Sequence, residues 1–260
     1  MAIWNVICYF TAASTGDASD FGDSSTAAQQ GSVGQCNSST RGVYNNGTTS
    51  AGTQTNTIEY VTMGSTGNAT DFGDATGIHA VGACMSNATV GFFCGGGNPN
   101  IDKITIASTG NATDFGDVIG GNSEQYYGGG MSGLANATRA VMQSGYAGSG
   151  YTQGYDYFTI SSGGNTSSFG EPRVRGTLTD NAWGYCAGNE TLGLWYGGEH
   201  AIPTEQIQKI TIASTGNGAA YATLGRSYND PPLNVDSSTS VDPINRYGGA
   251  TCNGSIGARG

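Results

Sequence analysis

Three acidic side chains recur at one point of a repeated strand, and their spacing suits acid–base chemistry. Glu59, Asp102 and Asp156 each follow an apolar residue, in NTIEYVT, IDKITIA and YDYFTIS. Two carboxylates on different repeats of a ring could act as the acid and base of a glycosidase. Repeat ancestry alone also produces such a column, which continues as Cys8 and Gln208 in two other copies. Catalysis usually breaks repeat symmetry, so we expect no catalytic residue here.

A second acidic pattern, DFGD, pairs carboxylates three residues apart, at Asp20/Asp23, Asp71/Asp74 and Asp114/Asp117. Carboxylates suit Ca²⁺, but Ca²⁺ takes six or more oxygen ligands and these loops are short. We therefore predict that Asp20, Asp71 and Asp114 accept hydrogen bonds from turn backbone, as Asp commonly does. The aromatic residue of each copy is predicted to pack between sheets, at Phe21, Phe72, Phe115 and Phe169.

Only two histidines are present, His79 and His200, and they fall at different points of the repeat. Neither has a cysteine or carboxylate cluster near it in the sequence. A zinc site or a Ser–His nucleophile needs more partners than this. The sequence therefore predicts ordinary structural roles for both histidines, with no metal site and no cofactor.

These residues are positioned by a ten-residue phrase that returns along the chain. It reads STGDASDFGD at residues 14–23 and STGNATDFGD at 65–74 and 108–117, and it decays to SGGNTSSFGE at 162–171 and STGNGAAYAT at 214–223. A period of roughly 40–50 residues is typical of solenoids and propellers.

Each unit reads as a set of short strands. Residues 90–97, VGFFCGGG, form a β-rich run that ends in three glycines, and residues 101–106, IDKITI, alternate apolar and polar side chains as a strand does. The other units keep this order, with 40–44, 138–145 and 192–198 matching the first run. We predict three clear strands and a short fourth one in each unit, and no helix.

The two ends of the chain fall inside a unit. The first residues read as the third strand of a unit, and the last ones, CNGSIGARG, match CNSSTRG at residues 36–42. This predicts one all-β domain, a five-bladed propeller closed by a blade that both ends share, which removes free sheet edges. The predicted blades are residues 24–74, 75–117, 118–171, 172–223, and 224–260 together with 1–23.

The composition narrows the classes of partner. The chain has 260 residues, a net charge of −10 and only two lysines, Lys103 and Lys209. This argues against nucleic acid and anionic membranes, which attract basic surfaces. No apolar run approaches the ~18 residues of a membrane span, and no secretory signal is visible at the start. Four of the six cysteines, Cys36, Cys84, Cys186 and Cys252, recur at one repeat position, where we predict core packing of free thiols.

The repeat resembles a known family. Glycine runs at 95–97 and 197–198, each followed by a strand of the form I-[DEQ]-x-[IV]-T, resemble kelch-type propeller blades. The pattern CxSxxTRGVY followed by STGNATDFGD is similar to kelch-like repeat proteins of tailed bacteriophages, especially of marine hosts. The resemblance implies a non-enzymatic virion protein of a capsid, tail or fibre. It would be made in the host cytoplasm, assemble in several copies with other virion proteins and contact the host surface. The last unit departs from the pattern, with YATL at 221–224 and a proline-rich insertion after it.

A lectin-like, carbohydrate-binding propeller is the alternative function. Aromatic residues such as Trp195, Tyr196 and Tyr151 could stack on sugars, although packing between blades is the competing interpretation. The proline-rich insertion contributes Asn229 and Asp230 as further candidate contacts. We therefore predict these five residues as contacts to a partner or a glycan.

Overall fold

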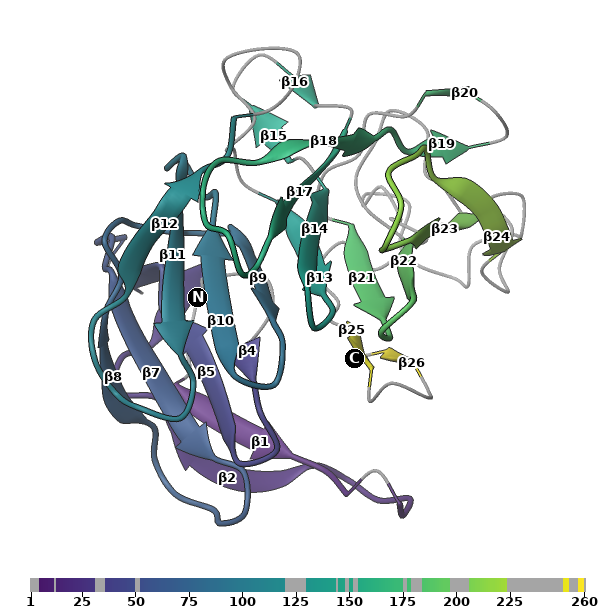
Figure 1. Cartoon of the computed structure of the whole chain (residues 1–260). Coiled ribbons are helices and arrows are strands. Elements are labelled where there is room, and N and C mark those ends of the chain that lie inside the picture. The colour runs from purple at the N-terminus through teal and green to yellow at the C-terminus, as the bar shows by residue number, and fades with distance from the viewer. Residues whose placement is uncertain are drawn as a thin grey trace, which may run out of the picture.

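The computed structural model is built from β-strands, which confirms the all-β prediction (Figure 1). No helix occurs among the residues that the structure describes, so none there is long and apolar enough to cross a membrane. The described residues are 5–11, 13–30, 36–49, 52–119, 130–143, 145–147, 150–151, 154–174, 177–178, 184–196, 206–223, 250–252 and 257–259.

Four antiparallel sheets of four strands follow the repeat, and we number them 2 to 5 along the chain. Sheet 2 holds β4 (Cys36–Asn37), β5 (Arg41–Asn45), β7 (Thr57–Thr62) and β8 (Thr70–Asp74). Sheet 3 holds β9 (Ala83–Ser86), β10 (Val90–Cys94), β11 (Asn100–Thr105) and β12 (Thr113–Asp117). Sheet 4 holds β13 (Ser132–Ala135), β14 (Arg139–Gln143), β17 (Tyr155–Thr159) and β18 (Ser167–Gly170). Sheet 5 holds β21 (Tyr185–Gly188), β22 (Leu192–Tyr196), β23 (Gln206–Thr211) and β24 (Ala219–Thr223).

The remaining strands form two-stranded sheets. Sheet 1 pairs β1 (Val6–Tyr9) with β2 (Ser19–Asp23), which match the third and fourth strands of the other units. The further pairs are β3 (Ala28–Gln30) with β6 (Thr48–Thr49), β15 (Tyr146–Ala147) with β16 (Gly150–Tyr151), β19 (Arg173–Val174) with β20 (Thr177–Leu178), and β25 (Ala250–Cys252) with β26 (Gly257–Arg259).

The first strands of successive units lie next to one another. Contacts run from β4 to β9, from β9 to β13, from β13 to β21 and from β21 to β25. The sheets therefore stand side by side around these strands, with their fourth strands outermost, in a β-propeller-like arrangement (Figure 1).

The apolar core lies between neighbouring sheets. One cluster joins sheets 2 and 3 through Val43, Phe72 and Phe93, and another joins sheets 3 and 4 through Phe92, Met142 and Phe158. A third joins sheets 4 and 5, where Tyr155 and Trp195 pack with ring centroids 4.9 Å apart. The second strands β10 and β14 therefore bury both faces, because sheets 3 and 4 each have a neighbour on either side.

Three of the repeated cysteines pack in these interfaces without forming disulfides. Cys36 and Cys84 are buried and Cys186 is half-buried. The Cys36 thiol donates to the Met85 carbonyl of the next sheet at 3.3 Å, and that of Cys186 donates to the Gly133 carbonyl at 3.0 Å. The packing prediction is confirmed for these three, whereas the side chain of Cys252 lies outside the described residues.

The ten-residue phrase forms a contact between sheets that we call the inter-sheet clasp. The turn after the third strand of one sheet binds the fourth strand of the sheet before it. Gly110 N donates to Phe72 O at 2.7 Å, Ala112 N donates to Asp74 O at 2.8 Å, and Asp74 N donates to Asn111 Oδ1 at 3.0 Å. The same three bonds recur at the other three junctions, where the turn glycines are Gly67, Gly164 and Gly216.

The clasp explains the glycine of DFGD. A Cβ built on Gly73, whose φ is +143°, would lie 2.5 Å from the backbone of Gly110. Gly22, Gly116 and Gly170 meet the turn of the next sheet equally closely. The glycine recurs wherever the clasp forms, because only a residue without a Cβ lets the two backbones approach this closely.

Candidate functional site

The recurring acidic column lies at a β-bulge in every unit. The pairing of β7 with β8 skips from Ile58↔Gly73 to Glu59↔Asp71, so Phe72 is the extra residue. The same shift precedes Cys8, Asp102, Asp156 and Gln208. Bulges redirect side chains, and here they accompany side chains that are buried between sheets: Glu59, Asp102, Asp156 and Gln208 are each at most 5% exposed.

Glu59 binds the segment that leads into its own sheet. Its carboxylate accepts hydrogen bonds from the Ser24 hydroxyl, from Ser25 N at 3.1 Å and from Asn46 Nδ2 at 3.0 Å. Burial alone would raise the pKa of this carboxyl, but the three donors outweigh burial and hold the pKa below its usual value. Glu59 is therefore a buried carboxylate whose oxygens are engaged by the protein itself.

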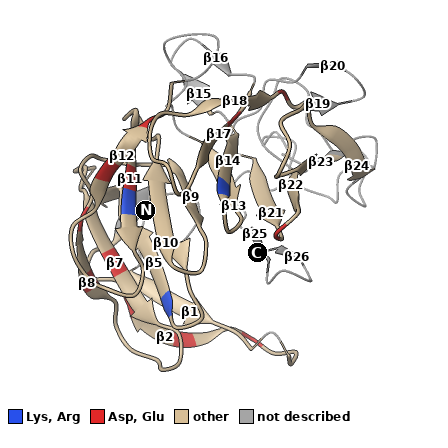
Figure 2. Cartoon of the chain, in the orientation of Figure 1, with Lys and Arg blue, Asp and Glu red and all other residues tan. Residues whose placement is uncertain are grey.

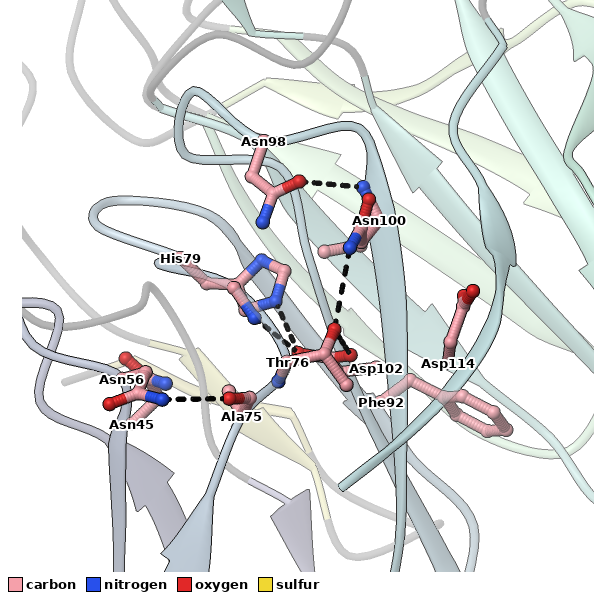
Figure 3. A network of polar contacts seen from close by, with 12 residues as sticks. Asn45, Asn56, Ala75, Thr76, His79, Phe92, Asn98, Asn100, Asp102 and Asp114 are labelled. Atoms are coloured by element: carbon pink, nitrogen blue, oxygen red, sulfur yellow. Dashed lines mark hydrogen bonds and ion pairs between the residues drawn. The ribbon is translucent and has the colours of Figure 1, made fainter. Parts of the chain in front are cut away.

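Asp102 occupies the equivalent place in sheet 3 (Figure 3). It accepts from Thr76 N at 2.8 Å and from the Thr76 hydroxyl, and its Oδ2 lies 2.8 Å from His79 Nε2. Burial favours the neutral acid, yet the bonds from His79 and Thr76 lower the pKa of Asp102 below its usual value. The lead-in segment, residues 75–82, is thus tied to the third strand of its sheet.

The three glycines after β10 complete this network. Gly95, Gly96 and Gly97 have φ of +76°, +77° and +93°, which side chains rarely adopt. A Cβ on Gly96 would lie 2.4 Å from Ala80 O, so the turn packs directly on the lead-in segment. The turn also places the carbonyl of Gly95 3.0 Å from His79 Nδ1.

Asp156 and Gln208 complete the column with different chemistry. Burial raises the pKa of Asp156 to about 6. Gln208 carries no charge, and its Oε1 lies 3.4 Å from the Tyr155 hydroxyl of the neighbouring sheet. The shared position therefore carries different polar chemistry from one sheet to the next.

The contacts of the column residues fit a role in stabilising the fold better than a role in catalysis. The oxygens of Glu59 and Asp102 are committed to donors on the lead-in segments, and both residues are almost fully buried. The sequence placed the column correctly and predicted a structural role for His79, but it gave no sign of the contact between His79 and Asp102. Its partner Asp102 lies 23 residues away, and no other unit has a histidine there.

The DFGD carboxylates lie on the outer strands β2, β8 and β12 (Figure 2). Asp71 Oδ1 accepts from Gly73 N, and Asp114 Oδ1 accepts from Gly116 N, both at 3.1 Å, which confirms the predicted turn bonds for these two residues. Across the described ranges, no group of three or more His, Cys, Asp or Glu side chains could hold a metal ion.

The predicted contact residues fall in different places. Trp195 is 1% exposed, and its indole Nε1 donates to Ser132 Oγ at 3.2 Å, so this ring packs between sheets 4 and 5. Tyr196 is half-buried, with its ring 6.0 Å from that of Tyr185. Tyr151 lies in β16, a strand described only by its backbone. Asn229 and Asp230 lie outside the described residues.

Comparison with known proteins adds no relative. No family model matches the chain, and no curated protein matches it.

Proposed function

We propose that this chain is a non-enzymatic structural or interaction protein of a tailed-phage virion, built as a five-bladed propeller whose last blade combines β25–β26 with β1–β2. The observation that carries the proposal is the use of the recurring carboxylates. Glu59 and Asp102, the side chains best placed for acid–base catalysis, hold lead-in segments through hydrogen bonds. Carboxylates that hold segments of their own protein in place are expected in a rigid structural protein.

The surface supports a role in an assembly. The clasp repeats at four junctions, so the outer strands follow one another in nearly the same conformation. Three of them carry the same sequence, DFGD, and its first aspartate is exposed in β2, β8 and β12. Repeated surfaces allow many weak contacts to add up when both partners are multivalent. A capsid, tail or fibre provides such a partner.

The shared blade is supported by equivalent positions. β1 pairs with β2 through the same bulge as β7 with β8, which makes β1 a third strand. β25 contacts β21 as the next first strand in the series. In the third strands β7, β11 and β17 the residue before the column is fully buried, whereas Ile7 of β1 is half-buried and Cys8 is exposed. The closing blade would cover this face.

The test is to purify particles of a phage that encodes this chain, and to combine mass spectrometry with a cryo-electron microscopy map. We expect the chain in fixed copy number and a ring of five blades at a symmetric position. Purified virions without the chain would overturn the proposal. If the chain is absent from particles and binds sugars on a glycan array, the lectin-like function replaces it.

A further inference from the structure

We propose that His79 and Asp102 form a buried imidazolium–carboxylate pair that fastens residues 75–82 to sheet 3, and that loss of the histidine proton releases this segment. The pair is fully buried, with both side chains 0% exposed. Its two members come from different elements, His79 from the lead-in segment and Asp102 from β11. Loss of one proton from the pair therefore weakens the connection between residues 75–82 and β11 (Figure 3).

The hydrogen-bond partners determine where the protons lie. Gly95 O can only accept, so the nitrogen 3.0 Å from it, Nδ1, carries a hydrogen. Asp102 already accepts from Thr76 N and the Thr76 hydroxyl, and its lowered pKa keeps it ionised. A carboxylate also only accepts, so Nε2 must carry the second hydrogen. Both ring nitrogens are then donors, and the ring is positively charged.

The surroundings make this charge depend on Asp102. Among the described residues, Asp102 on β11 and the thiol of Cys94 on β10 are titratable groups beside the pair; burial raises the pKa of Cys94, and its neighbours Cys36 and Asp102 raise it further. The neighbouring sheet contributes neutral amides, with Asn45 and Asn56 beside the network in Figure 3. A buried charge needs a paired partner, and among these groups Asp102 supplies it.

The segment that the pair holds is strained. Val81 has φ of +53°, and it is the only described residue other than glycine with positive φ. A β-branched side chain disfavours this conformation, which persists only where surrounding contacts impose it. Gly82 N donates to His79 O at 3.4 Å and Gly130 N donates to Val81 O at 2.8 Å, so the strained turn lies directly beside the histidine. If the pair breaks, fewer contacts hold Val81 in its strained conformation.

The first test is NMR of the full chain labelled with ¹⁵N-histidine. We expect one of the two histidines to show both ring nitrogens protonated at pH 7.5, a pattern that His79→Gln removes. If His79→Gln does not fold, His200→Gln assigns the signal instead, because it leaves His79 as the only histidine. Neutral-ring patterns for both histidines at pH 7.5 would overturn the proposal.

The second test measures release of the segment by amide hydrogen exchange. Thr76 N binds Asp102 at 2.8 Å beside the histidine, whereas Ser25 N binds Glu59 at 3.1 Å in a network without one. After correction for intrinsic exchange, we expect the protection of Thr76 to fall as the pH is raised while that of Ser25 stays constant. Equal behaviour of the two amides would contradict release. Val81→Gly should reduce the loss at Thr76, since it removes the strain that drives opening.

Discussion

At the scale of single residues, a carboxyl group at one repeat position can stabilise one sheet and destabilise another. Glu59 and Asp102 gain from donors that lower the pKa of each carboxyl. Asp156 occupies the same place, and burial raises its pKa to about 6. A raised pKa means that the folded state keeps a proton that the unfolded chain loses near pH 4. The contribution of Asp156 to stability therefore falls as the pH rises from about 4 to about 6.

We predict that Asp156→Asn stabilises the protein at neutral pH. The amide cannot ionise, so the variant avoids placing a charge between sheets 3 and 4. A shift of about two pKa units corresponds to about 3 kcal/mol, and we expect a gain of about 1–3 kcal/mol at pH 7.5 with little change at pH 4. Chemical denaturation at both pH values measures this. Asp17→Asn is the control, because it removes an exposed carboxylate. Equal shifts for both variants would show that burial of Asp156 is not the cause.

At the scale of elements, the inter-sheet clasp couples each outer strand to the next sheet through backbone groups. We predict that Gly73→Ala destabilises the protein by about 2–4 kcal/mol, because the added methyl group would lie 2.5 Å from Gly110 and force the backbones apart. Denaturation midpoints at constant pH give the difference.

Gly110→Ala separates steric conflict from backbone strain in the same clasp. Gly110 has φ of +153°, close to the +143° of Gly73, but a Cβ there meets nothing within 4 Å. The two substitutions therefore impose similar strain, and only Gly73→Ala adds a clash. A loss of stability as large for Gly110→Ala as for Gly73→Ala would mean that the close approach contributes little.

The elements were largely predictable from sequence because the repeat aligns them. The strand runs, the packing of Phe72 and the acidic column all follow from period-two alternation and recurrence. The clasp had a signal too, since the glycine and asparagine of the turn recur together with DFGD. The contact of His79 with Asp102 had none, because it joins a segment unique to one unit to a strand further along. The burial of Trp195 was also hidden, since alternation does not tell which face a neighbouring sheet covers.

At the scale of the whole molecule, arginines bridge neighbouring sheets, and the strand register predicts how the two ends of the chain would pair. Arg41 stacks on Tyr60 with its guanidinium carbon 4.5 Å from the ring centroid, and its Nη1 donates to Ile106 O of the next sheet at 3.0 Å. Arg139 repeats both contacts with Tyr157 and Ile212. In β25–β26, Cys252 pairs with Gly257 as Cys36 pairs with Val43 in β4–β5, and Tyr9 follows the bulge of β1 as Tyr60 follows that of β7. A shared blade would therefore place Gly257 opposite Tyr9, as Val43 lies opposite Tyr60.

We predict that cysteines at positions 9 and 257 become cross-linked within one chain. The experiment uses Tyr9→Cys with Gly257→Cys in a Cys8→Ser background, because Cys8 is an exposed thiol. The matched control is Arg41→Cys with Thr62→Cys, a pair that lies directly opposite in β5 and β7. A short bis-maleimide reagent is applied at low protein concentration, and peptide mapping by mass spectrometry identifies the linked residues. Equal yields for both pairs mean that the two ends complete one blade. Cross-linking in the control alone contradicts closure, and linked dimers at 9 and 257 mean that the blade is completed between two copies of the chain.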